Sequence, residues 1–176
     1  MDFPAWHGPP RDILGHPAPI AQFVARSEHA VVALQQFIAY PEGCGITLRI
    51  TARRGSLPET VWGRLYGPHG EMDPDLRFGV RFPDGSRATP VDNAFPGWAR
   101  PTDRPEPPML VDVASESGSS ADSYGCDRQM WLWPLPPPGP FEFVVEWQSM
   151  GIDMTAVTVD GTAIARAAEK AQPYWP

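Results

Sequence analysis

The segment HGEMD carries three potential metal ligands at alternate positions, namely His69, Glu71 and Asp73. A metal site requires such side chains at fixed spacings. The four histidines of the chain are isolated from one another, and Cys44 and Cys126 stand far apart. Neither C-x₂-C nor H-x₃-H occurs. A solvated loop is therefore the favoured interpretation of HGEMD, and we expect neither a metal nor another cofactor.

The sequence contains no recognisable nucleophile or carboxylate pair. The Gly-x-Ser-x-Gly motif is absent, and the serines of residues 115–123 lie in a polar run without the rigid placement that a nucleophile needs. Glu142 and Glu146 would lie roughly 13 Å apart on one strand, which is too far for either arrangement used in glycoside hydrolysis. These absences favour a non-enzymatic protein.

Seven tryptophans are a high number for a chain of 176 residues. Three of them fit strand patterns and are expected in the core: Trp131, Trp133 and Trp147. The other four lie in irregular segments: Trp6, Trp62, Trp98 and Trp175. Tryptophans on loops can stack against a partner, or they can pin a loop onto the protein body. Residues 61–70 and 93–98 supply the candidate binding residues, which are Trp62, Tyr66, His69, Phe95 and Trp98.

The most motif-like passage is WLWPLPPPGPFEFVVEW, residues 131–147. It is either a proline-rich ligand for a partner or a connection between two strands. A ligand would need an exposed polyproline stretch with polar flanks. Here the flanks alternate like strands, with Phe141, Phe143 and Val145 on one face and Glu142 on the other. We therefore predict an ordered connection that reverses the chain or crosses between sheets.

Strand patterns recur along the chain. ITLRITARR alternates apolar and polar residues, and PEGCG before it is a turn by composition, so residues 30–40 and 45–53 are predicted to form a hairpin. DLRFGVRF is the clearest strand, and Asp84-Gly85 after it predicts a second hairpin. The segment ASESGSSADSYG, residues 114–125, is expected to be a flexible polar loop.

These patterns predict an all-β fold, either an antiparallel β-sandwich or a barrel, with about eight or nine short strands and loops rich in Pro and Gly. One C-terminal helix is expected over about residues 161–171, capped by Asp160. Residues 1–19 are predicted to be an irregular N-terminal arm, and residues 20–176 a single domain. Tyr174 and Trp175 are expected to dock on this domain.

Charge and hydropathy restrict the expected partners and compartment. The net charge is −7 and there is no basic cluster beyond Arg53-Arg54, so neither nucleic acid nor an anionic membrane is an expected partner. No apolar run of about 18 residues occurs, and prolines stand where a secretory signal has its apolar core. We expect a cytoplasmic protein with reduced thiols, and a disulfide between Cys44 and Cys126 is the alternative.

The last part of the chain resembles a known group of proteins. WPLPPPGPFEFVVEWQSMGI is followed by a strand, by DGTAI, by an alanine-rich helix and by a terminal YW. With these features, residues 75–176 resemble a group of uncharacterised actinobacterial all-β proteins of similar size. The resemblance rests on structural residues, so it implies a fold and a taxon but no activity and no site residues.

Three functional hypotheses remain. The first is a non-enzymatic protein-interaction or assembly module, which contacts a protein partner or a second copy of itself through aromatic loops and the arm. The second is a small-ligand or carbohydrate-binding β-sandwich, which would need an aromatic pocket with convergent polar groups. The third is an enzyme of unrecognised type, which would need a buried titratable pair in a cleft.

Overall fold

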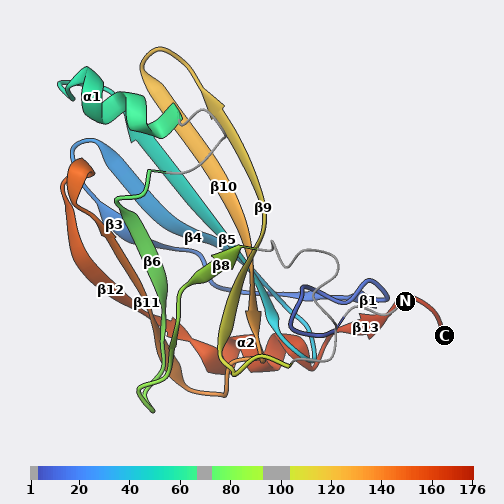
Figure 1. Ribbon diagram of the computed structural model, residues 1–176. Coiled ribbons are helices and arrows are strands. Elements are labelled where there is room, and N and C mark those ends of the chain that lie inside the picture. The colour runs from blue at the N-terminus through green and yellow to red at the C-terminus, as the bar shows by residue number, and fades with distance from the viewer. Residues whose placement is uncertain (1–3, 67–72, 93–103) are drawn as a thin grey trace.

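The protein is an open β-sandwich. The computed structural model describes residues 4–66, 73–92 and 104–176. A sheet of seven strands and a sheet of four strands share one core, and they do not close into a barrel (Figure 1). The prediction of an all-β sandwich is therefore confirmed, and the barrel alternative does not apply.

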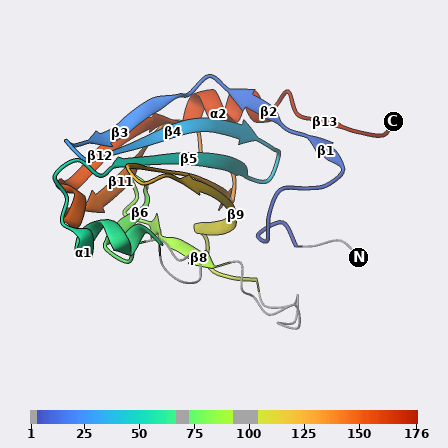
Figure 2. The ribbon, with the colours of Figure 1, turned by 90° about the horizontal axis from the view of Figure 1, so that it is seen from above.

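The larger sheet has the strand order β2-β4-β5-β10-β9-β8, and β3 also pairs with β4. Its strands are β2 (His16–Ala18), β3 (Gln22–Arg26), β4 (Ala30–Ala39), β5 (Cys44–Arg53), β8 (Pro90–Asp92), β9 (Met109–Ser119) and β10 (Ser123–Trp133). Every pair is antiparallel except that of β8 with β9. Figure 2 shows β3, β4 and β5 succeeding one another across this sheet.

The smaller sheet has the strand order β12-β11-β6-β7. Its strands are β6 (Leu76–Arg81), β7 (Arg87–Ala88), β11 (Pro140–Trp147) and β12 (Ile152–Asp160). A separate ribbon pairs β1 (Ile13–Leu14) with β13 (Gln172–Pro173), so segments near both ends of the chain lie side by side (Figure 1). The helices are α1 (Glu59–Trp62), α2 (Gly161–Ala168) and the 3₁₀ turns η1 (Gly63–Tyr66) and η2 (Gln148–Met150).

Both predicted hairpins are confirmed. Strands β4 and β5 pair across the PEGCG turn, and every second side chain of β5 from Cys44 to Ala52 is buried. Strands β6 and β7 pair across the Asp84-Gly85 turn. Gly85 has a φ of 87° there, a conformation that suits glycine because it has no Cβ. Alternation and turn chemistry together thus located four strands correctly.

The proline-rich segment, residues 134–139, carries the chain from β10 in the larger sheet to β11 in the smaller sheet. The amide of Leu135 donates to the carbonyl of Glu42 at 3.0 Å, and the amide of Gly161 donates to the carbonyl of Gly139 at 2.9 Å. The segment is therefore an ordered connection between sheets, as predicted. The strand that follows it buries the predicted face: Phe141, Phe143, Val145 and Trp147.

The prediction of a flexible loop at residues 114–125 is wrong. These residues form the distal half of the β9–β10 hairpin, which turns at Ala121 and Asp122. β10 also pairs with β5 along the same stretch, so backbone pairing holds residues that bury little side-chain area. Their polar composition reflects exposure rather than an absence of regular structure.

Smaller predictions also need correction. The N-terminal arm, residues 1–19, is not wholly irregular, because β1 pairs with β13 and β2 extends the edge of β4. The described residues contain thirteen strands rather than eight or nine. The additional ones are mostly strands of two or three residues, which are too short to show a periodic pattern. Helix α2 ends at Ala168 rather than at residue 171.

The predicted cap of α2 is confirmed. Oδ1 of Asp160 accepts hydrogen bonds from the amides of Thr162 at 3.0 Å and Ala163 at 3.2 Å. These amides have no carbonyl partner within the helix, so the side chain satisfies donors that would otherwise depend on water.

We expect Asp160→Ala to lower the free energy of unfolding by about 1 kcal/mol, because both amides lose their acceptor. Asp160→Asn keeps a side-chain oxygen and is the matched control, with a smaller expected loss. Urea unfolding measures the difference in the free energy of unfolding between the variants, and the slope of that free energy against urea concentration should be the same in all of them. An equal loss in both variants would contradict a role for the hydrogen-bonded cap.

Candidate functional site

The structure describes only part of the predicted binding residues. Trp62, the last residue of α1, is 3% exposed and packs in the main core. Tyr66 ends η1, and its side chain lies outside the described part of the structure. His69, Phe95 and Trp98 lie outside the described residues altogether. Trp62 therefore anchors α1 to the core, and its indole is not presented at the surface.

Asp73, predicted to lie in the solvated HGEMD loop, is buried with 1% exposure. Its Oδ2 accepts from Trp147 Nε1 at 3.0 Å and from Ser149 Oγ at 3.1 Å, while its Oδ1 accepts from the amide of Asp75 at 3.0 Å. The carboxylate thus ties the segment before β6 to the end of β11. Among the described residues, no group of three His, Cys, Asp or Glu side chains could hold a metal ion.

The two cysteines are free and buried, as expected for reduced thiols. Burial raises the pKa of the Cys44 thiol. Burial also raises the pKa of Cys126, although a hydrogen bond with Tyr124 acts in the opposite direction. Because the thiolate is the reactive form of cysteine, burial disfavours a nucleophilic role for either side chain.

A second apolar cluster lies on the face of the larger sheet opposite the main core, and it consists of Met109, Val111, Trp131 and Trp133. The N-terminal arm covers it. Trp131 Nε1 donates to the carbonyl of Ala5 at 2.8 Å, and Trp6 meets Trp133 edge to face with ring centres 5.8 Å apart. Trp6 is therefore a pin that holds the arm on the sheet, one of the two roles considered for tryptophans in irregular segments.

The β1–β13 ribbon and the two residues after it carry three exposed apolar side chains, which we call the aromatic ribbon: Leu14, Tyr174 and Trp175. Their exposed fractions are 53%, 53% and 77%. The backbone is paired as far as Tyr174, because β1 pairs with β13 and the amide of Tyr174 donates to the carbonyl of Asp12 at 2.8 Å. The paired backbone thus presents Leu14 and Tyr174 to solvent, and Trp175 follows directly after it.

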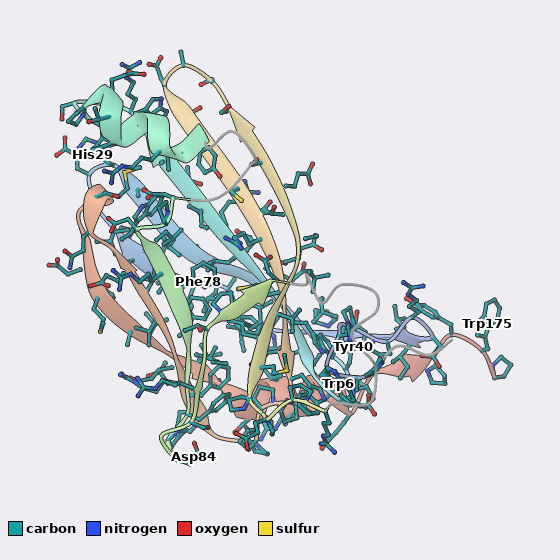
Figure 3. The ribbon with its side chains drawn as sticks, in the orientation of Figure 1. Trp6, His29, Tyr40, Phe78, Asp84 and Trp175 are labelled. Carbon is teal, nitrogen blue, oxygen red and sulfur yellow. The ribbon has the colours of Figure 1, made fainter. Side chains whose placement is uncertain are left out.

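The prediction that Tyr174 and Trp175 dock on the domain is therefore wrong for their side chains. Figure 3 shows Trp175 projecting away from the body at the far end of the ribbon. The neighbouring aromatic surface is already occupied, since Tyr40 packs against Trp131 with ring centres 5.6 Å apart. Burial, with the nearby Tyr174 phenol as a smaller cause, raises the pKa of Tyr40. Tyr174 thus lies beside Tyr40 and Trp175 beyond it.

The other large apolar side chains exposed in the described part of the chain are Phe23 on β3 and Met154 on β12. Strands β3 and β12 lie on the opposite side of the sandwich from the β1–β13 ribbon (Figure 1). The guanidinium of Arg26 stacks over the Phe23 ring at 4.3 Å from its centre. Phe23 is thus partly shielded by its own strand and is 56% exposed, compared with 77% for Trp175.

A groove of about 400 Å³ lies between the proline-rich connection and the β6–β7 turn, and prolines dominate its lining. The amide and the hydroxyl of Ser86 both donate to Oδ1 of Asp84, at 2.8 and 2.6 Å. A specific small-ligand site needs several polar groups that converge on the ligand. In this groove the polar side chains bind each other, so it gives little support to the carbohydrate-binding alternative.

No protein-family model, curated protein or solved structure matches the chain. The resemblance of residues 75–176 to an actinobacterial group therefore stays a prediction. Within the described ranges, no helix has both the length and the apolar character needed to cross a bilayer.

Proposed function

We propose that the protein is a non-enzymatic interaction module that binds another protein through the aromatic ribbon. The observation that carries this proposal is the 77% exposure of Trp175, which directly follows a backbone paired as far as Tyr174. Because the backbone is paired up to Tyr174, the rings that follow lose less conformational freedom on binding than rings on a disordered tail.

The chemistry of the ribbon suits a protein partner. Tyr and Trp are enriched among the hot spots of protein interfaces, where they fill well-packed pockets of the partner. Burying one such side chain contributes on the order of 2 kcal/mol. The complementary surface is an apolar groove that accepts two aromatic rings. A basic rim around that groove would be favoured by the net charge of −7.

We place this module in the cytoplasm. The buried free thiols of Cys44 and Cys126 support a reducing compartment. The net charge of −7 makes phosphate backbones unfavourable partners, so a protein is the more suitable ligand than a nucleic acid.

Trp175→Ala is expected to reduce partner capture from native-cell extract by about tenfold or more, the effect of losing one hot spot. The melting temperature should stay the same, because the side chain is 77% exposed. Phe23→Ala, which removes an aromatic side chain of 56% exposure from β3, is the matched control and should capture the partner normally. Quantitative identification of captured proteins, with thermal melts of each variant, checks both results.

Unchanged capture by Trp175→Ala would contradict the proposal. So would an equal loss with Phe23→Ala, which would indicate non-specific adhesion of exposed rings. A fall in the melting temperature of Trp175→Ala would instead assign the ring a structural role.

A further inference from the structure

The outer edge of β9 is a second surface, separate from the aromatic ribbon. β8 pairs with β9 only at residues 110–112. Among the residues that the structure describes, no strand pairs with the outer edge of Ala114–Ser119, and all six of these residues are exposed. Unpaired backbone groups along a sheet edge are a template for pairing with another chain.

The hairpin turn determines which backbone groups of this edge point outward. The amide of Ser120 donates to the carbonyl of Ser123 at 2.8 Å, so these two residues form a hydrogen-bonded pair. Antiparallel strands alternate between hydrogen-bonded and non-hydrogen-bonded pairs. The register runs without a shift from the turn to Ala114. Every second residue therefore directs its N–H and C=O away from β10: Ser115, Ser117 and Ser119.

We propose that this edge pairs with the same edge of a second copy of the protein, antiparallel about a two-fold axis at Ser117. In this register Ser117 faces Ser117 of the second copy, and Ser115 faces Ser119. Each residue with outward backbone groups then faces such a residue of the second copy. Such pairing allows about six backbone hydrogen bonds and joins the two larger sheets into one.

The side chains of this segment select a second copy as the occupant. The sequence ASESGS contains only small side chains and one carboxylate. In the proposed register Glu116 faces Gly118 of the second copy, so the two carboxylates do not stand directly opposite each other. The segment contains neither proline nor lysine, which commonly block exposed edges. Its pattern is thus complementary to itself in hydrogen bonding, and the register keeps the two carboxylates from facing each other directly.

The contact is expected to be reversible. Stable interfaces bury about 1,200 Å² or more, and pairing of this one short segment buries less than that. The dimer should therefore form with increasing protein concentration, and analytical ultracentrifugation of the full chain should show a rise toward twice the monomer mass of 19.4 kDa.

Cysteine crosslinking tests the register. In Ser117→Cys the two new residues should have Cα atoms about 5.5 Å apart, which is within the range of a disulfide. Oxidised glutathione should therefore link most of this variant into a dimer. Ser115→Cys is the matched control, because its two copies would lie roughly 14 Å apart along the strand. A mixture of Ser115→Cys with Ser119→Cys should link again.

A proline variant tests the backbone contacts independently. Ser117→Pro removes an outward N–H and leaves the donors of the β9–β10 ladder in place, so it should abolish the dimer with an unchanged near-UV spectrum. Ser117→Ala keeps the N–H and should dimerise like the original protein. If the proline variant fails to fold, the crosslinking result decides.

Four results would overturn the proposal. The first three are a monomer at all concentrations, equal crosslinking of Ser117→Cys and Ser115→Cys, and a dimer that survives in folded Ser117→Pro. Loss of the dimer in Trp175→Ala would transfer self-association to the aromatic ribbon and would also overturn it. Partner capture through the ribbon is measured separately, so either proposal can fail alone.

Discussion

Replacing Trp147 by alanine is expected to lower the free energy of unfolding by about 3–5 kcal/mol. Trp147 is fully buried in the core shared by the two sheets. Its Nε1 donates to Oδ2 of the buried Asp73 at 3.0 Å. The truncation removes the packing of the indole and also a donor to a carboxylate that water does not reach. Since domains are stable by only about 5–15 kcal/mol, this variant should be close to unfolding.

Trp147→Phe separates the two contributions. It retains an aromatic ring and removes the donor to Asp73, with an expected loss of about 1–3 kcal/mol. Trp131→Phe is the matched comparison, because Trp131 is equally buried but donates to the backbone carbonyl of Ala5 on the arm. The Ala5 carbonyl is neutral and its residue is half-buried. Losing the hydrogen bond to it should therefore lower the free energy of unfolding by less than losing the hydrogen bond to Asp73. Denaturant unfolding measures both variants, and a larger loss for Trp131→Phe would contradict the importance of Asp73.

Strands with one buried face and one exposed face could be predicted from the sequence. β11 alternates phenylalanine, valine and tryptophan with glutamate, and its buried side chains are the predicted ones. β5 and β6 follow the same rule. In each case the period of two and the turn beside it are local properties of the chain. The connection between β10 and β11 could be predicted for the same reason, since its prolines lie outside both alternating patterns.

The rest of the fold depends on partners distant in sequence. Ala114–Ser119 is exposed on both faces, so nothing in its composition separates an edge strand from a loop. It is a strand because β10 pairs with it, and β10 in turn pairs with β5. The β1–β13 ribbon is a similar case. Two strands of two residues have no measurable period, and they meet only because the whole sandwich brings both ends of the chain together.

In the candidate site, too, the local sequence identifies candidate residues, but contacts distant in sequence decide their roles. Tryptophans in irregular segments were predicted to be either pins or contacts, and composition alone cannot separate these roles. Trp6 and Trp62 are pins, since each packs on a buried cluster. Trp175 is exposed, because it lies two residues past the end of β13 and projects away from the body (Figure 3). The role of each ring is thus decided by tertiary position.

Gly161→Ala is expected to lower the free energy of unfolding by about 1–3 kcal/mol, the usual cost of overpacking a core. A Cβ at Gly161 would lie 2.4 Å from the carbonyl oxygen of Gly139 and 2.7 Å from that of Pro137. Both oxygens belong to the backbone of the proline-rich connection, which cannot rotate away as a flexible side chain can. The same substitution would strain the hydrogen bond that the Gly161 amide donates to the carbonyl of Gly139, which is 2.9 Å long in the original protein.

Gly63→Ala provides the control for this prediction. Gly63 has a helical backbone, with φ of −62° and ψ of −20°, and a Cβ there would meet nothing within 4 Å. Its replacement should stabilise the protein slightly, because alanine loses less backbone freedom on folding than glycine does. Urea unfolding of both variants should therefore give shifts of opposite sign. A Gly161→Ala protein as stable as the original would show that the connection yields easily, and that its prolines do not hold α2 against the two sheets.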